Sequence, residues 1–263
     1  ASMIGYVTMG MSIIPLFAPG LGGLIQMLLG WPSIFLIMSL LGLLLLLLVF
    51  RDLGETKIIK KNKNTKSSAS FINLFWEAKF WGYSFTLAFS AGTFFSFLGG
   101  APYVATKVYN LNSVISGLVM GFPAAGYFIG NYLSGRYSKF YGIDYMALRG
   151  ILLVIFGMFI CLVITVFYRD TPYFFFGLCS FVGLGNGLII PNASVGILSV
   201  NENLSGTAGG IGNAIMIGTG AILASLTSYY LENQTSSSCL VFIMLLSGAL
   251  SYTSLYIFVL RNK

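Results

Sequence analysis

Histidine is absent from this sequence of 263 residues, and charged residues make up only 8% of it. An ordinary soluble domain has roughly 25% charged residues, so a water-exposed surface cannot be built from this composition. Hydrophobic residues make up 57% of the chain, and its mean hydropathy is +0.88. The scarcity of charge therefore excludes a soluble globular protein and favours one that lies in a bilayer.

Regular alternation of polar and apolar residues is also missing, which excludes a transmembrane β-barrel. Instead the sequence contains many apolar runs of about twenty residues, the length that a helix needs to cross a bilayer. Their boundaries at Gly, Pro, Asn or charged residues predict eight spans and hence an all-α, polytopic membrane protein. The predicted spans are residues 4–28, 32–50, 80–104, 113–135, 146–168, 172–198, 204–231 and 238–260.

Cysteine is scarce as well. Cys161 and Cys179 fall within apolar spans and Cys239 lies near the start of another, which argues against a disulfide framework or a metal site. We expect these residues to serve as small packing residues. No catalytic residue, metal site or cofactor is predicted, and the chain is not expected to be an enzyme.

Carboxylates are absent from the middle of every predicted span. A carboxylate there would cost several kcal/mol and would be the first candidate for proton or substrate work. Proton coupling by a buried acid therefore cannot be assigned within this chain. The seven acidic residues, all in predicted loops or at span ends, are Asp52, Glu55, Glu77, Asp144, Asp170, Glu202 and Glu232.

The only long polar stretch, residues 51–79, lies between the second and third predicted spans and carries seven Lys and Arg residues. Because Lys and Arg resist translocation, this stretch should be a cytoplasmic loop. With alternating crossings, twelve of the fourteen Lys and Arg then fall inside, and only Lys107 and Arg169 fall outside. Both termini should be cytoplasmic, and the net charge of +7 reflects topology rather than nucleic-acid binding.

Glycine, by contrast, is abundant, with 32 residues, and it recurs at a spacing of four. Small residues at this spacing lie on one helical face and let two helices approach closely in lipid. They indicate either ordinary bundle packing or an interface that slides or rocks. The four pairs are Gly117 with Gly121, Gly126 with Gly130, Gly183 with Gly187, and Gly206 with Gly210.

Amides and aromatic rings are the candidates for a substrate cavity. Asn186 and Asn213 lie in mid-span beside Gly residues that leave room, and each needs either a hydrogen bond to another helix or a wet cavity. Phe94 and Phe97 share a helical face, where they could line a pocket for a bulky or cationic ligand, or else pack against the core or lipid. We expect these four residues and Met216 to lie near a cavity.

Particular strings resemble the major facilitator superfamily, and within it the bicyclomycin-resistance (Bcr/CflA) branch of drug:proton antiporters. Gly5, Pro19, Gly22 and Gly23 match the antiporter motif of that superfamily's fifth helix, although Ile14 and Ala18 replace two of its glycines. The strings at residues 94–104, 130–142 and 205–210 resemble the seventh helix, a cytoplasmic-loop motif that lacks its Asp, and the start of the eleventh helix.

The resemblance implies a partial major facilitator fold that corresponds to helices five to twelve. Residues 1–50 would be the last two helices of the N-terminal half, residues 51–79 the central cytoplasmic loop, and residues 80–263 the complete C-terminal six-helix half. Four helices would then be missing, and the chain begins with Ala1 rather than Met, so we expect a fragment or a truncated product.

The implied function is export of drugs or small molecules by proton antiport across a bacterial inner membrane, with lipid and the small-molecule substrate as partners. The antiporter-motif residues would pack the fifth helix against the other half, and Arg136 and Lys139 would help to close the cytoplasmic face. One alternative is an importer of a small metabolite with the same fold. The other is a non-functional remnant, because loss of four helices would leave half of the cavity unlined.

Overall fold

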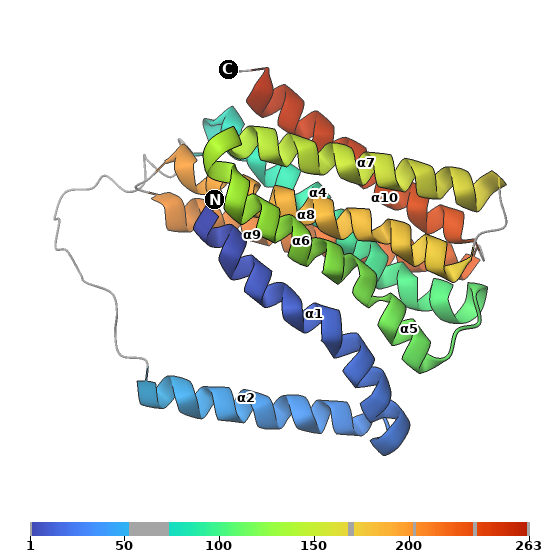
Figure 1. Ribbon diagram of the computed structural model, residues 1–263. Coiled ribbons are helices and arrows are strands. Elements are labelled where there is room, and N and C mark those ends of the chain that lie inside the picture. The colour runs from blue at the N-terminus through green and yellow to red at the C-terminus, as the bar shows by residue number, and fades with distance from the viewer. Residues whose placement is uncertain (1, 53–73, 168–170, 202–203, 234–235, 262–263) are drawn as a thin grey trace.

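The structure is a computed structural model, and it describes residues 2–52, 74–167, 171–201, 204–233 and 236–261 (Figure 1). Within these ranges the regular elements are all helical, and eight helical spans are long and apolar enough to cross a membrane. The prediction of an all-α polytopic protein with eight such helices is confirmed. Most of the predicted central loop, residues 53–73, lies outside the described residues.

The spans end within a few residues of their predicted limits, and the largest difference is at the end of α6, which continues to residue 141. Three spans contain a second element: α5 precedes α6 in one, and short π-helical turns, η1 and η3, extend α4 and α10 in the other two. In chain order the elements are α1 (Ser2–Leu29), α2 (Pro32–Asp52), α4 (Ala78–Tyr103), η1 (Val104–Val108), α5 (Ser113–Val119), α6 (Gly121–Tyr141), α7 (Ile143–Phe167), α8 (Pro172–Val200), α9 (Ser205–Asn233), α10 (Ser237–Leu255) and η3 (Tyr256–Leu260).

Local sequence explains where several helices begin and end. Gly30 and Gly142 end α1 and α6 with φ values of 79° and 82°, a conformation that residues with a Cβ rarely adopt. The side chain of Asn112 caps α5 by accepting a hydrogen bond from the backbone of its first turn. Pro123 lacks the N–H that would bond the carbonyl of Val119, which interrupts the helix between α5 and α6.

The centre of the bundle is the contact between α6 and α8, where two glycine pairs face one another. A Cβ placed on Gly126, Gly130 or Gly183 would overlap a backbone carbonyl of the opposite helix, and one on Gly187 would lie 2.6 Å from the backbone nitrogen of Asn131. The two backbones therefore touch directly, as expected for small residues at a membrane helix interface. This confirms the predicted packing role of these pairs.

The other two glycine pairs differ from one another. Gly117 and Gly121 lie against the backbone of α1, where their Cβ atoms would be 2.6 and 3.0 Å from the carbonyl oxygens of Pro19 and Leu16. Gly206 and Gly210 on α9 have no described atom within 4 Å of such a Cβ, so the packing expectation does not hold for them within the described structure.

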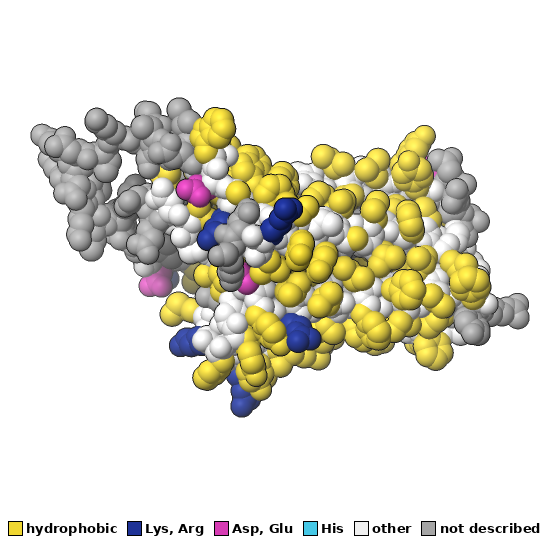
Figure 2. Space-filling model, turned by 90° about the horizontal axis from the view of Figure 1, so that it is seen from above, with side chains coloured by type: hydrophobic (Ala, Val, Ile, Leu, Met, Phe, Trp, Pro, Cys, Tyr) yellow, Lys and Arg dark blue, Asp and Glu magenta, His cyan; other side chains and the backbone are white. Residues whose placement is uncertain are grey.

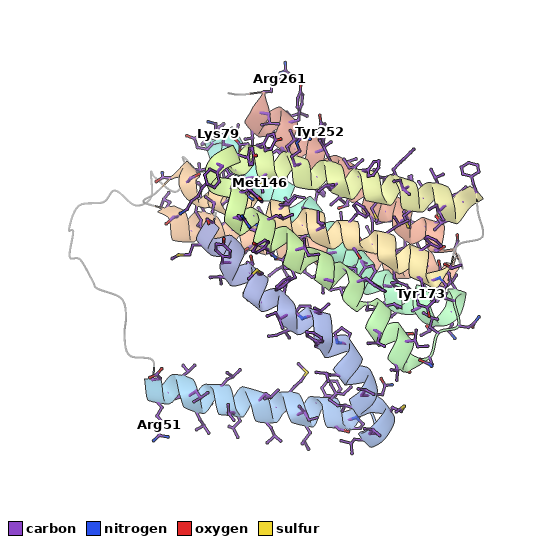
Figure 3. All side chains as sticks on the ribbon, in the orientation of Figure 1. Arg51, Lys79, Met146, Tyr173, Tyr252 and Arg261 are labelled. Atoms are coloured by element: carbon purple, nitrogen blue, oxygen red, sulfur yellow. The ribbon has the colours of Figure 1, made fainter. Side chains whose placement is uncertain are left out.

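Around this centre, α4 packs along α9 and α10, α7 packs along α8, and α1 crosses obliquely over α5 and α6 (Figure 1). α2 stands apart from the bundle, has α1 as its main neighbour and contains no buried residue. Apolar side chains cover most of the face in Figure 2, and its coloured charged groups lie toward one end. Figure 3 places Arg51, Lys79 and Arg261 at one end of the helices and Tyr173 at the other.

Candidate functional site

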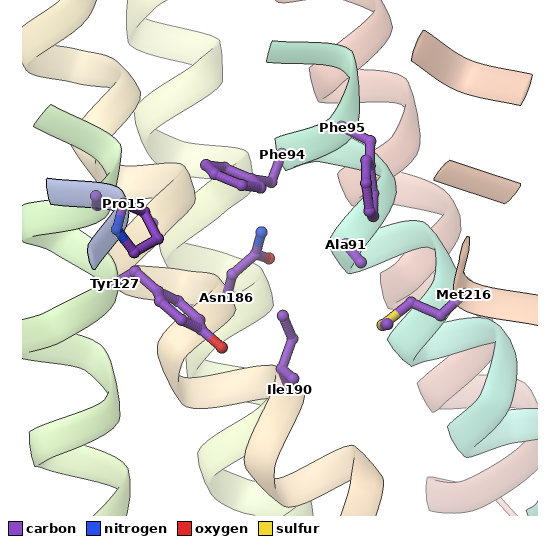
Figure 4. Close-up of a pocket in the computed structure, with 10 residues that line it drawn as sticks. Pro15, Ala91, Phe94, Phe95, Tyr127, Asn186, Ile190 and Met216 are labelled. Carbon is purple, nitrogen blue, oxygen red and sulfur yellow. The ribbon is translucent and has the colours of Figure 1, made fainter. Parts of the chain in front are cut away.

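An apolar cavity of about 220 Å³ lies where α1, α4, α6, α8 and α9 meet (Figure 4). No lining residue carries a charged side chain, and three of them are aromatic. The lining residues are Pro15, Ala91, Phe94, Phe95, Ala124, Tyr127, Gly183, Asn186, Ile190 and Met216. Because the lining comes from five helices that are far apart in the sequence, the cavity is a property of the assembled bundle.

Asn186 places the one side-chain amide in this lining; two hydrogen bonds hold it, and a third joins its two partners. The hydroxyl of Ser90 donates to its Oδ1 at 2.5 Å, and its Nδ2 donates to Oγ1 of Thr93 at 3.4 Å. Thr93 in turn donates its hydroxyl to the backbone carbonyl of Ser90 at 2.6 Å. All three side chains are buried, so the bonds form a closed ring between α4 and α8.

The cavity brings together three of the five predicted cavity residues: Phe94, Asn186 and Met216. Phe97 is not part of the lining. It is fully buried behind Phe94, with ring centroids 6.4 Å apart, and makes an edge-on contact with Phe176 at 6.1 Å. Asn213 is exposed on α9 and does not line this cavity.

The four residues that resemble the antiporter motif all lie on α1, which packs on α5 and α6. A Cβ on Gly5 would be 2.7 Å from the backbone nitrogen of Gly135, and one on Gly23 would be 3.2 Å from the carbonyl of Ser113. Pro19 contributes the carbonyl that meets Gly117, whereas Gly22 has no described atom within 4 Å of a Cβ position. Gly5, Pro19 and Gly23 thus lie at close contacts with neighbouring helices.

Arg136 and Lys139 lie at the end of α6 away from the cavity, and both are exposed. Arg136 donates from Nη1 to the hydroxyl of Tyr132 at 3.0 Å, and its guanidinium lies 5.6 Å from the ring centroid of Tyr137. Both partners are on the same helix. Within the described structure these two cations therefore remain at the surface of one bundle end.

Two buried polar clusters lie outside the cavity lining. Tyr83 on α4 donates to Oδ1 of Asp144 at 2.6 Å, and both side chains are buried. Asn192 on α8 donates to Ser134 on α6 at 2.8 Å, and its Oδ1 has no hydrogen-bond partner among the described residues. Asp144 was placed in a loop, but α7 begins at residue 143, which buries it in the first turn.

Sequence reasoning also missed the cavity roles of Pro15, Tyr127 and Ile190. Pro15 lies inside α1, where a proline can kink the helix, and Tyr127 lies one residue after Gly126 on the helix that packs against α8. The signal that could have found Tyr127 is its place beside that glycine pair, because the residues flanking a close helix contact line whatever space opens next to it.

Comparison with known proteins yields one family and several relatives. A family model described as Major Facilitator Superfamily matches residues 1–225. A bicyclomycin resistance protein homolog of Haemophilus influenzae is 28% identical over 235 residues, which cover 87% of this chain and 58% of that protein. Multidrug resistance protein D of Escherichia coli K12 is 26% identical over 251 residues, covering 93% of this chain and 61% of that protein.

An uncharacterized transporter of Rickettsia felis is 25% identical over 271 residues, which cover 97% of this chain and 67% of that protein. The chain thus spans about three fifths of the length of the two relatives named for drug resistance.

Proposed function

Because the chain belongs to the major facilitator superfamily, a family of transporters rather than enzymes, we propose that it forms one wall of the substrate pathway in a proton-driven exporter of small aromatic molecules. The observation that carries this proposal is the apolar, partly aromatic cavity with the single amide of Asn186 in its wall. Largely apolar pockets with few polar groups are typical of small-molecule sites.

Export of drug-like molecules is further supported by the names of two relatives, a bicyclomycin resistance protein homolog and a multidrug resistance protein. The antiporter-like residues of α1 support proton antiport, which is also the mechanism that the resemblance to the bicyclomycin-resistance branch implies. We propose that the chain corresponds to helices five to twelve of such a transporter, in a bacterial inner membrane with both termini of this chain in the cytoplasm.

The proposed roles follow the positions of the side chains. Phe94, Asn186 and Met216 contact the substrate, and Phe97 supports the ring of Phe94 from behind. Asn213 lies three residues before Met216, hence on the same face of α9, so we place it along the same pathway outside the cavity. Arg136 and Lys139 are proposed to help close the cytoplasmic face, and Gly5, Pro19, Gly22 and Gly23 to seal α1 against its neighbours.

Efflux of the uncharged aromatic dye Nile red tests this function. The full product of the gene would be expressed in bacteria that lack their own exporters, and dye loss would be followed by fluorescence. We expect these cells to lose dye faster than vector controls, and a protonophore to abolish the difference.

In the same assay Asn186→Leu should slow efflux by about tenfold, the effect of losing one hydrogen bond to a ligand. Gln26→Leu is the matched control, because it removes an exposed amide of α1 that does not line the cavity. A rate of dye loss that the protonophore does not change would contradict proton antiport. Faster accumulation of dye than in vector controls would favour an importer.

A further inference from the structure

We infer that the cavity selects uncharged, planar ligands that carry a hydrogen-bond acceptor, and that Ser90 and Thr93 impose this preference by fixing the amide of Asn186. The inference rests on the proposed function, since it concerns the ligand of the same cavity. It assigns two positioning residues on α4 that do not need to touch the ligand themselves.

The ring of hydrogen bonds favours one orientation of the amide. Thr93 has a single hydroxyl hydrogen, which it donates to the carbonyl of Ser90, so its oxygen can only accept from Asn186. If the amide were turned over, its oxygen would face the lone pairs of Thr93. The hydroxyl of Ser90 donates to the amide oxygen at 2.5 Å, which favours the same orientation.

This orientation leaves a donor for the cavity. An Asn amide has two N–H groups, and the described residues accept only one of them, at Thr93. Figure 4 shows the amide nitrogen directed toward the Phe94 side of the cavity and the amide oxygen turned toward α4. A buried N–H without an acceptor costs free energy, so a ligand that brings a carbonyl or ether oxygen gains by satisfying it.

The rest of the lining defines the ligand's shape and charge. Phe94, Phe95 and Tyr127 offer aromatic faces and edges, which favour flat aromatic rings. No described lining residue could neutralise a charged ligand, and burial of an unpaired charge is far more costly than burial of a carbonyl group. At about 220 Å³ the cavity is smaller than the roughly 300–1000 Å³ of common ligand pockets, so it suits a planar ligand of a few fused rings.

α10 holds the part of α4 that carries the two positioning residues. Ser247 donates to the carbonyl of Phe89 at 2.7 Å, and Ser251 donates to the carbonyl of Thr86 at 3.1 Å. These bonds hold the α4 backbone one and four residues before Ser90, and both serines are buried. The hydroxyls that orient Asn186 are thus themselves on a backbone segment tied to a third helix.

Three flat tricyclic probes have nearly the same shape but differ in their hydrogen-bonding group. 9-Fluorenone carries a carbonyl acceptor, carbazole carries an N–H donor, and fluorene carries neither. Binding of tritiated 9-fluorenone to the purified chain in detergent would be measured with the other two as competitors. We expect 9-fluorenone to bind about tenfold more tightly than fluorene or carbazole. The cation 10-methylacridinium, of similar shape, should not compete.

Ser90→Ala frees the amide to rotate. The preference for 9-fluorenone, measured as the Kd of carbazole divided by the Kd of 9-fluorenone, should therefore fall toward one. Ser90→Thr keeps the hydroxyl and should therefore show the same preference as the unchanged chain. Thr93→Val should lower the preference as Ser90→Ala does. Ser84→Ala is the matched control, because Ser84 is a buried serine of α4 whose hydroxyl has no partner among the described residues. It should leave the preference unchanged.

Equal or tighter binding of carbazole, competition by 10-methylacridinium, no binding of any probe, or an unchanged preference in folded Ser90→Ala would each overturn the inference. Efflux separates this result from the proposed function. A 9-fluorenone preference without Nile red efflux would contradict only the proposed exporter, and efflux without the preference would contradict only the inferred selectivity.

Discussion

Tyr83 and Asp144 form a hydrogen bond that joins the second turn of α4 to the first turn of α7 inside the bundle. Their oxygen atoms are 2.6 Å apart, a length typical of a hydroxyl that donates to a carboxylate. The sequence could not reveal this pair, because the two residues are 61 positions apart and hydropathy placed Asp144 before its helix. Asn186 could be predicted, because an amide in mid-membrane always needs a polar partner or a cavity.

Replacing Tyr83 with Phe tests the contribution of this pair to stability. The variant removes the hydroxyl and deprives a buried carboxylate of one donor, so unfolding should require roughly 1.5–3 kcal/mol less free energy. The measurement is the midpoint of thermal unfolding of the purified chain in detergent. Tyr173→Phe is the control, because Tyr173 is 66% exposed, and its midpoint should not change. Equal midpoints for Tyr83→Phe and the unchanged chain would refute this contribution.

At the scale of the elements, the contact between α6 and α8 determines how the cavity is built. Gly183 belongs both to this contact and to the cavity lining, so the close approach of the two backbones brings Tyr127 and Asn186 into the same cavity wall. The four-residue spacing predicted that glycines would pack, but Gly206 and Gly210 have the same spacing and remain open. Spacing identifies a helical face, whereas the partner of that face depends on the whole bundle.

Gly183→Ala and Gly177→Ala differ only in where the added methyl group lies on α8. At residue 183 the methyl would overlap the carbonyl of Pro123, so we expect a loss of about 1–3 kcal/mol or more and weaker probe binding. At residue 177 nothing lies within 4 Å, so Ala should be neutral or stabilise the helix by up to about 1 kcal/mol. Unfolding midpoints that fall equally in both variants would rule out the proposed close contact.

At the scale of the whole molecule, alternating helices bring Arg51, Lys79 and Arg261 to one end and Tyr173 to the other (Figure 3). Hydropathy predicted the number of helices because each span must hide its backbone from lipid. It could not predict that α2 would stand apart, since an almost uniform run of leucines has no distinct face to direct packing. The arrangement of the helices depends instead on glycines and polar side chains, which give a helix a distinct face to direct its packing.

Single cysteines near the ends of two spans, in η1 and α6, test the orientation. In a variant with Cys161, Cys179 and Cys239 replaced, Lys107→Cys should react with a membrane-impermeant maleimide from outside intact cells. Lys139→Cys should react only after the cells are permeabilised, because twelve of fourteen Lys and Arg then lie in the cytoplasm. The opposite labelling pattern would reverse the proposed topology.

The most direct test of the cavity as the ligand site is photocrosslinking with xanthone, a planar, uncharged tricyclic ketone whose excited carbonyl group abstracts hydrogen from nearby C–H bonds. Met216 lines the cavity, whereas Met27 and Met38 are 64% and 66% exposed and serve as controls on α1 and α2. We expect irradiation to label Met216, and excess 9-fluorenone or Asn186→Leu to suppress that label without affecting the controls. Labelling of the exposed methionines alone, or a Met216 label that 9-fluorenone does not displace, would contradict a ligand site in this cavity.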